Sequence, residues 1–171
     1  MGAYRVHLEH LFGGSALAPV GGDGRVKLPR FVRETAVRRS EDRTLVLGPH
    51  EADPCLTGYD RPYRRMLFAD TERLRLAGEA GPADAKAEAP RRARRTFGLT
   101  EEAPWSDDGT IRLPAMVRRM GRIDGLALFV GTGGAFEIWN PHLAAESGDP
   151  DLAELARWRL GHDTASHEEE E

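Results

Sequence analysis

Two similar twelve-residue stretches occur in this chain of 171 residues, and this repeat constrains the fold more than any other feature. DGRVKLPRFVRE begins at Asp23 and DGTIRLPAMVRR begins at Asp108. Such agreement indicates an internal duplication. A chain of this length forms one ordinary domain or two small halves around one core, and the repeat favours two halves. The identical pairs are Asp23/Asp108, Gly24/Gly109, Leu28/Leu113, Pro29/Pro114, Val32/Val117 and Arg33/Arg118.

Each copy predicts the same run of secondary structure. An Asp-Gly turn signal opens it, and the next residues alternate apolar and polar as a half-buried strand does. The proline that follows suits the first turn of a helix, where its missing N–H would have no partner. A short helix should come next, because apolar residues recur with helical spacing. These are Phe31, Val32 and Val37 in the first copy and Met116, Val117 and Met120 in the second.

Two further strands are expected after each short helix, at 44–48 and 55–59 in the first half and at 127–131 and 136–139 in the second. The order β, short α, β, β thus occurs twice, which predicts a mainly β protein with short helices, of the α+β class. Halves this short cannot each bury much core alone. We therefore expect them to interlock into one barrel-like, pseudo-two-fold unit.

The segments outside the repeats have distinct compositions. The helical pattern of PYRRMLFADTERLRL is followed by AGEAGPADAKAEAP, which is poor in aromatic residues and typical of a flexible linker or mobile surface loop. RRARRTFGL then predicts a basic helical segment. Near the end, DLAELARWRL predicts an amphipathic helix and HEEEE a disordered tail. The expected organisation is a first half at 12–65, a helical and flexible connector at 66–97, a second half at 98–145 and an acidic extension at 146–171.

The charge of the chain is unevenly distributed. The formal net charge is −4, yet ten acidic residues face only two arginines from Glu137 onward, so residues 1–136 carry a net +4. This is a weak electrostatic footprint for a nucleic-acid binder. No apolar run approaches the ~18–20 residues of a membrane span, and no signal-peptide core is present, so we expect a cytoplasmic protein without membrane contact. The single cysteine, Cys55, is expected to be a buried apolar residue.

Residues that could carry catalysis are sparse. No nucleophile–base pair, phosphate-binding loop, dinucleotide fingerprint or metal-ligand spacing is recognisable, so we predict neither an enzyme nor a cofactor or metal site. The GTGG sequence at 131–134 falls between two expected strands, which favours a turn.

The arginines offer a binding function instead. Arg25 directly follows an Asp-Gly turn, on the kind of protruding loop that reaches into a DNA groove, where a guanidinium pairs with guanine or phosphate. The alternative is a solvated loop arginine. Arg33 and Arg118 lie one helical turn after the prolines and are interpreted as intramolecular or subunit-interface partners. Further candidate DNA contacts are Lys27 and Arg112 in the repeat strands and the run Arg91, Arg92, Arg94 and Arg95, which equally suits a solvated helix.

The pattern F-x-G-x-x-x-x-x-x-x-x-x-G-R-x-x-x-P-x-x-x-R runs from Phe12 to Arg33. It resembles the start of the MraZ family, bacterial transcription factors of the cell-division and cell-wall gene cluster. RRARRTFGL resembles the arginine-rich helix of that family and AFEIWNPHLAA its closing aromatic strand, so the likeness covers roughly residues 12–145. The resemblance implies a double-psi-barrel-like fold of two SpoVT-AbrB halves. It also implies a nucleoid-associated, ring-shaped homo-oligomer that binds repeated boxes of double-stranded DNA near its own promoter. The matching positions are Phe12, Gly14, Gly24, Arg25, Pro29 and Arg33.

The chain departs from the family pattern at the two turns. The family usually has D-x-x-G-R there, but Gly21 and Ser106 stand where the aspartates belong, and Thr110 replaces the second arginine. Asp23 occupies a position that is often basic in the family. These departures motivate an alternative function, an oligomeric scaffold or protein-binding module on the same fold that has lost DNA binding.

Overall fold

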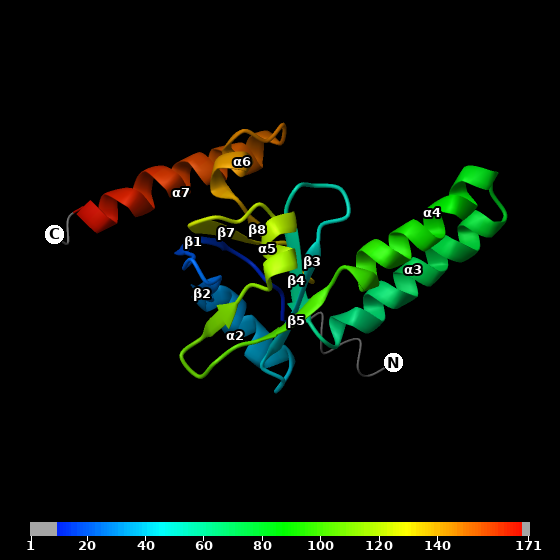
Figure 1. Ribbon diagram of the computed structural model, residues 1–171, viewed down its shortest axis with the longest axis horizontal. Coiled ribbons are helices and arrows are strands. Elements are labelled where there is room, and N and C mark those ends of the chain that lie inside the picture. Colours follow the sequence, from blue (N-terminus) through cyan, green and yellow to red (C-terminus); the bar gives the residue numbers. More distant parts are fainter. Residues whose placement is uncertain (1–9, 169–171) are drawn as a thin grey trace.

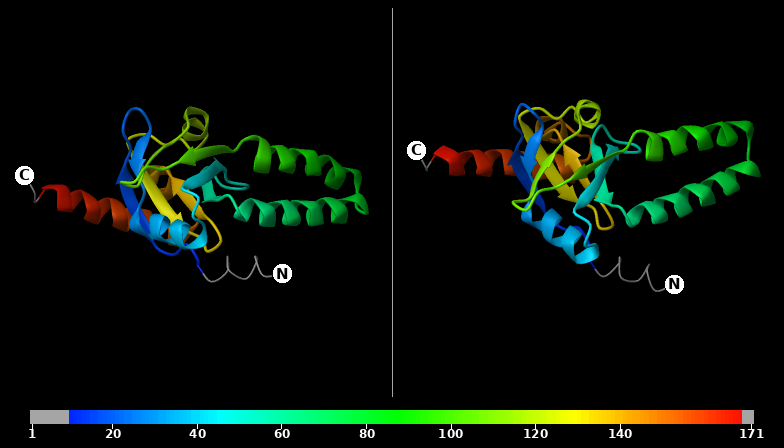
Figure 2. Two further views of the ribbon diagram at one scale, coloured as in Figure 1. Left: turned by 90° about the horizontal axis from the view of Figure 1, so that it is seen from below. Right: turned by 60° about the horizontal axis from the view of Figure 1, so that its bottom comes forward.

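The computed structural model describes residues 10–168, with side chains described up to residue 163. A central β-core carries two helical projections (Figures 1 and 2): the hairpin of α3 and α4 extends from one end, and the long helix α7 extends from the other. No described helix is long and apolar enough to cross a membrane.

Every described strand pairing is antiparallel. The main sheet has the order β1-β7-β8-β4-β3-β5, and β2 pairs with β6 as a separate two-stranded ribbon. The halves exchange their first strands, because β1 pairs with β7 of the second half and β5 pairs with β3 of the first. The strands are β1 Ser15–Pro19, β2 Arg25–Lys27, β3 Thr44–Pro49, β4 Leu56–Asp60, β5 Glu101–Pro104, β6 Thr110–Arg112, β7 Leu126–Gly131 and β8 Phe136–Trp139.

Short helices follow the repeat strands, and longer ones lie outside the repeats. The expectation of a mainly β protein with short helices, built from two related halves, is confirmed. The expected turn at 131–134 joins β7 to β8, so that prediction is also correct. The helices are α2 Arg30–Arg39, α3 Tyr63–Glu79, α4 Ala83–Ala93, the π-helical turn η1 Arg94–Gly98, α5 Ala115–Met120, α6 Pro141–Ala145 and α7 Pro150–Glu168.

The predicted β-α-β-β order misses the first strand of each half. The strands β1 (SALAP) and β5 (EEAP) contain no β-branched or aromatic residue, so they carry little strand propensity of their own. Each is held by hydrogen bonding to a strand of the other half. The observed order in each half is therefore β-β-α-β-β.

Equivalent positions of the two repeats fill one core. Val26 and Ile111 are each 2% exposed, and Val32 and Val117 are completely buried. The expected helix faces are wrong at Val37 and Met116, which are 54% and 41% exposed. In α2 the buried face follows Val32, Ala36 and Arg39, a helical spacing that turns Val37 toward solvent.

The expected linker or mobile loop at 77–90 is wrong, because residues 83–93 form helix α4, which packs antiparallel against α3. Alternate residues from Ala83 to Ala89 are alanine, the strongest helix former. Gly78, Gly81 and Pro82, which made the composition linker-like, gather at the turn between the helices. Proline is tolerated there, at the start of a helix.

The disorder expected for HEEEE is wrong at its first two residues, because α7 continues through His167 and Glu168. A helix already anchored by packed turns propagates at low cost. Residues 169–171 lie outside the described part of the chain.

Candidate functional site

The two repeat strands pair with each other, and this pairing builds the candidate site. Side chains alternate between the faces of a strand. Val26 and Ile111 therefore point into the core, while Arg25 and Arg112 face solvent with side chains 63% and 59% exposed. Lys27 is exposed on the same face as Arg25. The cross-strand partners are Arg25 with Arg112, Val26 with Ile111 and Lys27 with Thr110.

The turn before each repeat strand has the same backbone. The Gly24 amide donates to the carbonyl of Gly21 at 2.9 Å, and the Gly109 amide donates to that of Ser106 at 2.8 Å. Gly24 and Gly109 have φ values of +87° and +82°, in the left-handed region that favours glycine. A Cβ on Gly24 would lie 2.9 Å from the carbonyl oxygen of Leu113. The left-handed φ therefore favours glycine at both positions, and at Gly24 the nearby Leu113 carbonyl also leaves no room for a Cβ.

Each half of the chain holds the turn of the other half. Arg33 Nη1 donates to the carbonyl of Asp108 at 3.3 Å, and Arg118 Nη1 donates to that of Gly22 at 3.0 Å. Of the two expected roles, intramolecular or subunit-interface partner, these contacts correspond to the intramolecular one. Their helices α2 and α5 begin directly after Pro29 and Pro114. Two backbone hydrogen bonds of 2.9 Å also join the two halves. The amide of Leu28 donates to the carbonyl of Gly109, and the amide of Leu113 donates to the carbonyl of Gly24.

The first turn presents a cation that is paired but accessible. Asp23 Oδ1 accepts from the amide of Arg25 at 3.1 Å, and its Oδ2 lies 3.3 Å from Arg25 Nε and 3.8 Å from Arg112 Nη2. The hydrogen bond from the Arg25 amide, helped by the charges of Arg25 and Arg112, holds the pKa of Asp23 below its usual value. Pairs this exposed are weak, so both guanidinium groups remain available to a ligand.

In the second turn, the aspartate is bonded by other residues of the same turn. Asp108 accepts from the hydroxyl of Ser106 and from the amide and hydroxyl of Thr110, the last two at 3.1 and 3.0 Å. The Ser106 bond is the main reason that the pKa of Asp108 is also low, and the Thr110 bonds add to it. Next to it, Asp107 pairs with Arg43. Thr110 therefore offers a hydroxyl, already bonded to Asp108, where the first turn offers Arg25.

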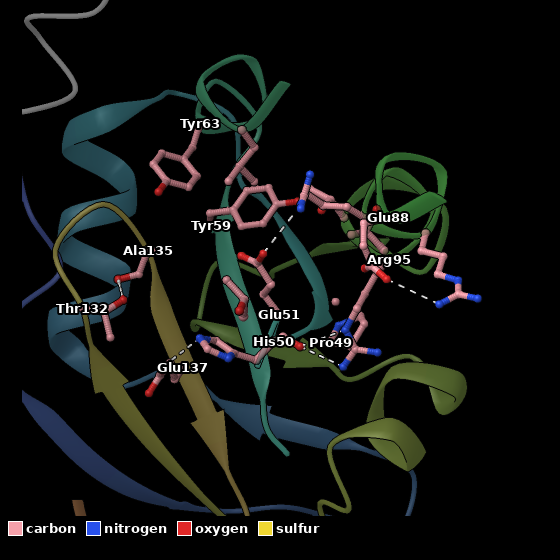
Figure 3. Close-up of a pocket in the computed structure, with 17 residues that line it drawn as sticks. Pro49, His50, Glu51, Tyr59, Tyr63, Glu88, Arg95, Thr132, Ala135 and Glu137 are labelled. Carbon is pink, nitrogen blue, oxygen red and sulfur yellow. Dashed lines mark hydrogen bonds and ion pairs between the residues drawn. The ribbon is translucent and has the colours of Figure 1, made fainter. Parts of the chain in front are cut away.

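The arginine run lies apart from the ribbon, beside a cavity of about 460 Å³ under the helical hairpin (Figure 3). Three of the four arginines line this cavity, and each has an intramolecular partner. Arg95 donates twice to the carbonyl of His50, at 3.1 and 2.8 Å. Arg91 lies 3.4 Å from Glu88, and Arg92 lies 3.9 Å from Glu51. The fourth, Arg94, lies in η1. The structure does not bring this run together with Arg25, Lys27 and Arg112.

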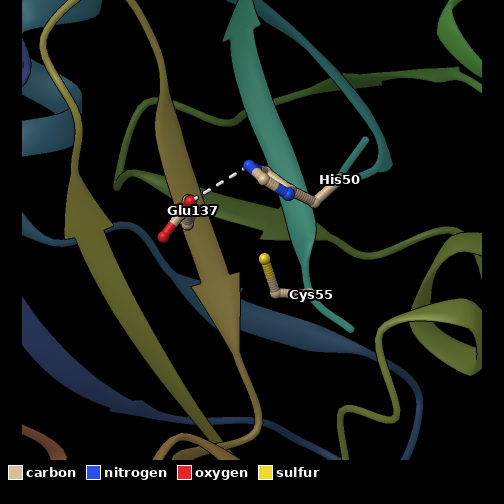
Figure 4. Close-up of side chains that lie close together, drawn as sticks. All are labelled: His50, Cys55 and Glu137. Atoms are coloured by element: carbon tan, nitrogen blue, oxygen red, sulfur yellow. Dashed lines mark ion pairs between the residues drawn. The ribbon is translucent and has the colours of Figure 1, made fainter. Parts of the chain in front are cut away.

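A cluster of His50, Cys55 and Glu137 lies beside the same cavity (Figure 4), with potential ligand atoms within 4.8 Å of one another. His50 Nδ1 accepts from the amides of Ala52 and Asp53 at 3.2 and 3.0 Å. The Nε2 atom therefore carries the proton and lies 3.3 Å from Glu137 Oε2. Burial raises the pKa of the Cys55 thiol well above its usual value. His50 and Glu137 thus lie next to Cys55, which is 2% exposed, and the expected burial of Cys55 is confirmed.

Two exposed arginines next to the ribbon were not singled out in the sequence. Arg30, at the start of α2, shares a surface depression with Lys27, and its side chain is 85% exposed. Arg119, in α5, lines a depression with Arg112 and Asp23. The repeat could have predicted both arginines. A short helix that directly follows a ribbon strand places some of its residues beside that strand.

A buried ion pair was also missed. The side chains of Arg39 and Asp60 are 1% and 2% exposed, and their nearest charged atoms lie 3.4 Å apart. Arg39 donates to the carbonyl of Gly134 at 2.7 Å and packs over the ring of Phe12. Desolvation lowers the pKa of Arg39, and the charge of Asp60 opposes that shift. The pair belongs to the core rather than to a ligand site.

Together, fold and surface define a small duplicated β protein whose repeat strands form one basic ribbon. No family model matches the chain. Curated relatives named transcriptional regulator MraZ do match. The protein from Rhodospirillum rubrum is 30% identical over 121 residues, covering 69% of this chain and 72% of its own length. Those from Azotobacter vinelandii and Bordetella pertussis are 24% and 26% identical, covering 85% and 84% of this chain and 90% and 92% of their own lengths. The chain belongs to the MraZ family of transcriptional regulators, which confirms the resemblance of its motifs.

Proposed function

We propose that this regulator binds double-stranded DNA through the β2–β6 ribbon. The observation that carries the proposal is the pairing of Arg25 with Arg112 across the ribbon, with Lys27 on the same face. A two-stranded antiparallel ribbon fits the major groove of DNA. Guanidinium groups on such a ribbon can pair with guanine edges or clamp phosphates.

The ribbon of one subunit carries a modest charge, partly offset by Asp23. We therefore extend the proposal to a ring-shaped homo-oligomer that binds repeated boxes in its own promoter. Linked weak contacts gain affinity through effective concentration, so a ring facing repeated boxes needs little from each ribbon. In this role the protein acts in the cytoplasm at the nucleoid, and its targets belong to the cell-division and cell-wall gene cluster. The Arg91–Arg95 run is a secondary candidate for contact with phosphates.

One observation favours a second candidate function. The second turn places Thr110 where the family has an arginine, and Asp108 and Ser106 bond to that residue. A protein that keeps Arg25 but has Thr110 in place of the second turn arginine could serve as an oligomeric scaffold or protein-binding module. The ribbon would then contact a protein surface instead of DNA.

The deciding experiment is fluorescence anisotropy with a labelled duplex from the region upstream of the chain's own coding sequence. Wild type, Arg25→Ala and the control Arg73→Ala are titrated at two salt concentrations. Arg73 is a matched exposed arginine, 76% exposed and paired with Asp70, but it lies on α3. Affinity should fall steeply with salt because counterions are released from DNA.

Arg25→Ala should weaken binding by about tenfold or more, since a groove arginine contributes roughly 1–3 kcal/mol. Arg73→Ala should bind like wild type. Equal losses in both variants would exclude the ribbon as the contact surface. A folded, oligomeric wild type that binds no upstream DNA would favour the scaffold function.

A further inference from the structure

A cavity of about 460 Å³ lies between the β-core and the helical hairpin (Figure 3). The strands β3, β4 and β8 supply one wall, and the helical segments α3, α4 and η1 supply the other. Cavities that enclose small molecules have volumes of roughly 300–1,000 Å³ and combine an apolar surface with a few polar groups. The size of this cavity therefore suits a small molecule, and the lining determines which kind.

Two arginines of the helical wall carry charge that is weakly compensated. The Arg92 side chain is 26% exposed, and its Nε atom lies 3.9 Å from a carboxylate oxygen of Glu51, which is beyond hydrogen-bonding distance. Arg95 donates to a neutral acceptor, the carbonyl of His50, and forms no ion pair with any residue that the structure describes. Both arginines line the cavity and are three positions apart, so this side of the helical wall can receive an anion.

The other carboxylates of the lining are engaged elsewhere. Glu88 lies 3.4 Å from Arg91, in an exposed pair on α4. Glu137 accepts a hydrogen bond from the indole Nε1 of Trp139 at 2.9 Å and lies 3.3 Å from Nε2 of His50. Neither carboxylate therefore cancels the charge of the two weakly compensated arginines.

The helical wall is irregular where it meets the cavity. Helix α4 runs directly into the π-helical turn η1, which contains Arg95. Such π-helical turns are rare, and they occur frequently at functional sites. Here the turn holds Arg95 within hydrogen-bonding distance of His50, the residue that follows β3. The irregular turn thus coincides with a cationic side chain of the cavity.

Another part of the lining is apolar and includes a hydroxyl that can donate. Tyr63 and Leu67 of α3 pack beside Tyr59, and all three line the cavity. Tyr59 is 3% exposed, and its hydroxyl has no well-aligned hydrogen-bond partner. Arg64 lies near this hydroxyl, but a guanidinium cannot accept its proton. Burial raises the pKa of Tyr59, so the hydroxyl keeps its proton and can donate it to a ligand.

We infer that this cavity binds a small organic phosphate, with Arg92 and Arg95 on the phosphate group and the side chains of α3 against its apolar part. Guanidinium groups pair with phosphate through two parallel hydrogen bonds, and two such groups match a dianion better than the single charge of a carboxylate. The bound ligand touches both walls, so it holds the hairpin against the β-core. This function goes beyond DNA binding and gives the regulator a site for an effector.

Isothermal titration calorimetry of the full chain tests the cavity, with phenyl phosphate as the probe. Phenol and benzoate are the comparison probes, because phenol lacks the anion and benzoate carries a single charge. Phenyl phosphate should bind at one site per chain, at least about tenfold more tightly than either comparison probe.

Arg92→Gln and Arg95→Gln should each weaken the binding of phenyl phosphate by about tenfold, because each removes charged hydrogen-bond donors. The matched control Arg94→Gln alters an exposed arginine that lies between them in the chain but does not line the cavity, so it should bind like wild type. Tyr59→Phe should weaken binding while leaving the melting temperature unchanged, because the hydroxyl proton has no acceptor in the free protein. Circular dichroism melting checks that all variants stay folded.

No saturable binding of phenyl phosphate, or equal affinity in wild type and both cavity variants, would overturn the inference. An equal loss in Arg94→Gln would place the effect outside the cavity and overturn it too. DNA phosphates offer the same chemistry, so the anisotropy assay is repeated with Arg92→Gln and Arg95→Gln. Unchanged DNA affinity supports the small phosphate, whereas a loss of DNA affinity without phenyl phosphate binding would assign these arginines to the DNA backbone. The cavity does not depend on DNA binding by the ribbon, so the two proposals fail separately.

Discussion

The two turns of the repeat share one backbone but present different chemistry to solvent. Both contain a glycine with positive φ and the same backbone hydrogen bonds. Asp23 nevertheless faces two guanidinium groups, whereas Asp108 is bonded to the hydroxyls of Ser106 and Thr110. The duplication thus keeps the residues that hold the turn. The residue after each glycine differs: Arg25 and Thr110 each bond to the aspartate of their own turn and do not pack in the core.

The helices that follow the turns differ inside the core. Helix α2 has ten residues and ends in the buried Arg39, whereas α5 has six, ends at Met120 and is followed by Gly121. A Cβ on Gly121 would lie 2.6 Å from a side-chain carbon of Leu56, so the chain leaves the helix at a close approach. The repeat register places Asp124 at the position equivalent to Arg39, and Asp124 is exposed. Among the residues that the structure describes, the buried ion pair therefore lies in the first half alone.

The largest effect is expected from breaking this asymmetry with Arg39→Ala. The substitution removes the cation that faces Asp60 in the core, and removing one partner of a buried pair costs about 3–5 kcal/mol. Urea unfolding followed by circular dichroism measures the loss. The control Arg38→Ala, on the exposed face of the same helix, should change stability by less than about 0.5 kcal/mol. Similar losses in both variants would show that the pair has no special role.

The turn glycines give the next largest effect. Gly24→Ala should destabilise by about 2–3 kcal/mol, because it combines a left-handed φ with a clash against the backbone oxygen of Leu113. Gly109→Ala should cost less, about 1–2 kcal/mol, because its Cβ would meet the movable end of Arg33. Urea unfolding of both variants establishes the order. A larger loss at Gly109 would mean that the Arg33 contact holds the turn more rigidly than the Leu113 backbone does.

Thr110→Arg tests the surface difference by restoring a cation on the second turn. DNA affinity should rise several-fold, and the slope of log affinity against log salt should steepen by about one for one added phosphate contact. Anisotropy titrations over a salt series measure both quantities. Thr110→Val removes the hydroxyl bond to Asp108 without adding charge, so it should leave both unchanged. An affinity gain in Thr110→Val would assign the effect to the loosened turn instead of the charge.

The smallest effect concerns pH. The pKa values of Asp23 and Asp108 lie below the ordinary value of 3.8, so each carboxylate stabilises the fold at higher pH. That contribution is complete above about pH 3.8 and is lost as the pH falls through the lowered pKa. Asp108→Asn should therefore flatten the acid limb of stability against pH, measured by urea unfolding between pH 2 and 5. An acid limb identical to that of wild type would rule out this linkage.

Local patterns predicted the elements whose signals are local. The Asp-Gly turns, the prolines before α2 and α5 and the apolar runs of β3, β4, β7 and β8 were all identified from a few neighbouring residues. The strands β1 and β5 and helix α4 were missed. The first two depend on partners in the other half, and the alanines of α4 were outweighed by the glycines and proline of the preceding turn. The candidate site was predicted residue by residue, but its arrangement was not.

By itself, the sequence determined the duplication, the glycines of the turns and the starts of the repeat helices, because backbone preferences act within a few residues. Only the tertiary structure decided that Arg25 lies opposite Arg112 and that the two halves exchange their first strands. It also decided that Arg33 and Arg118 each reach the turn of the other half, across 75 and 96 residues of chain. Contacts between such distant residues are set by strand pairing and by the packing of a shared core, and no local pattern encodes them.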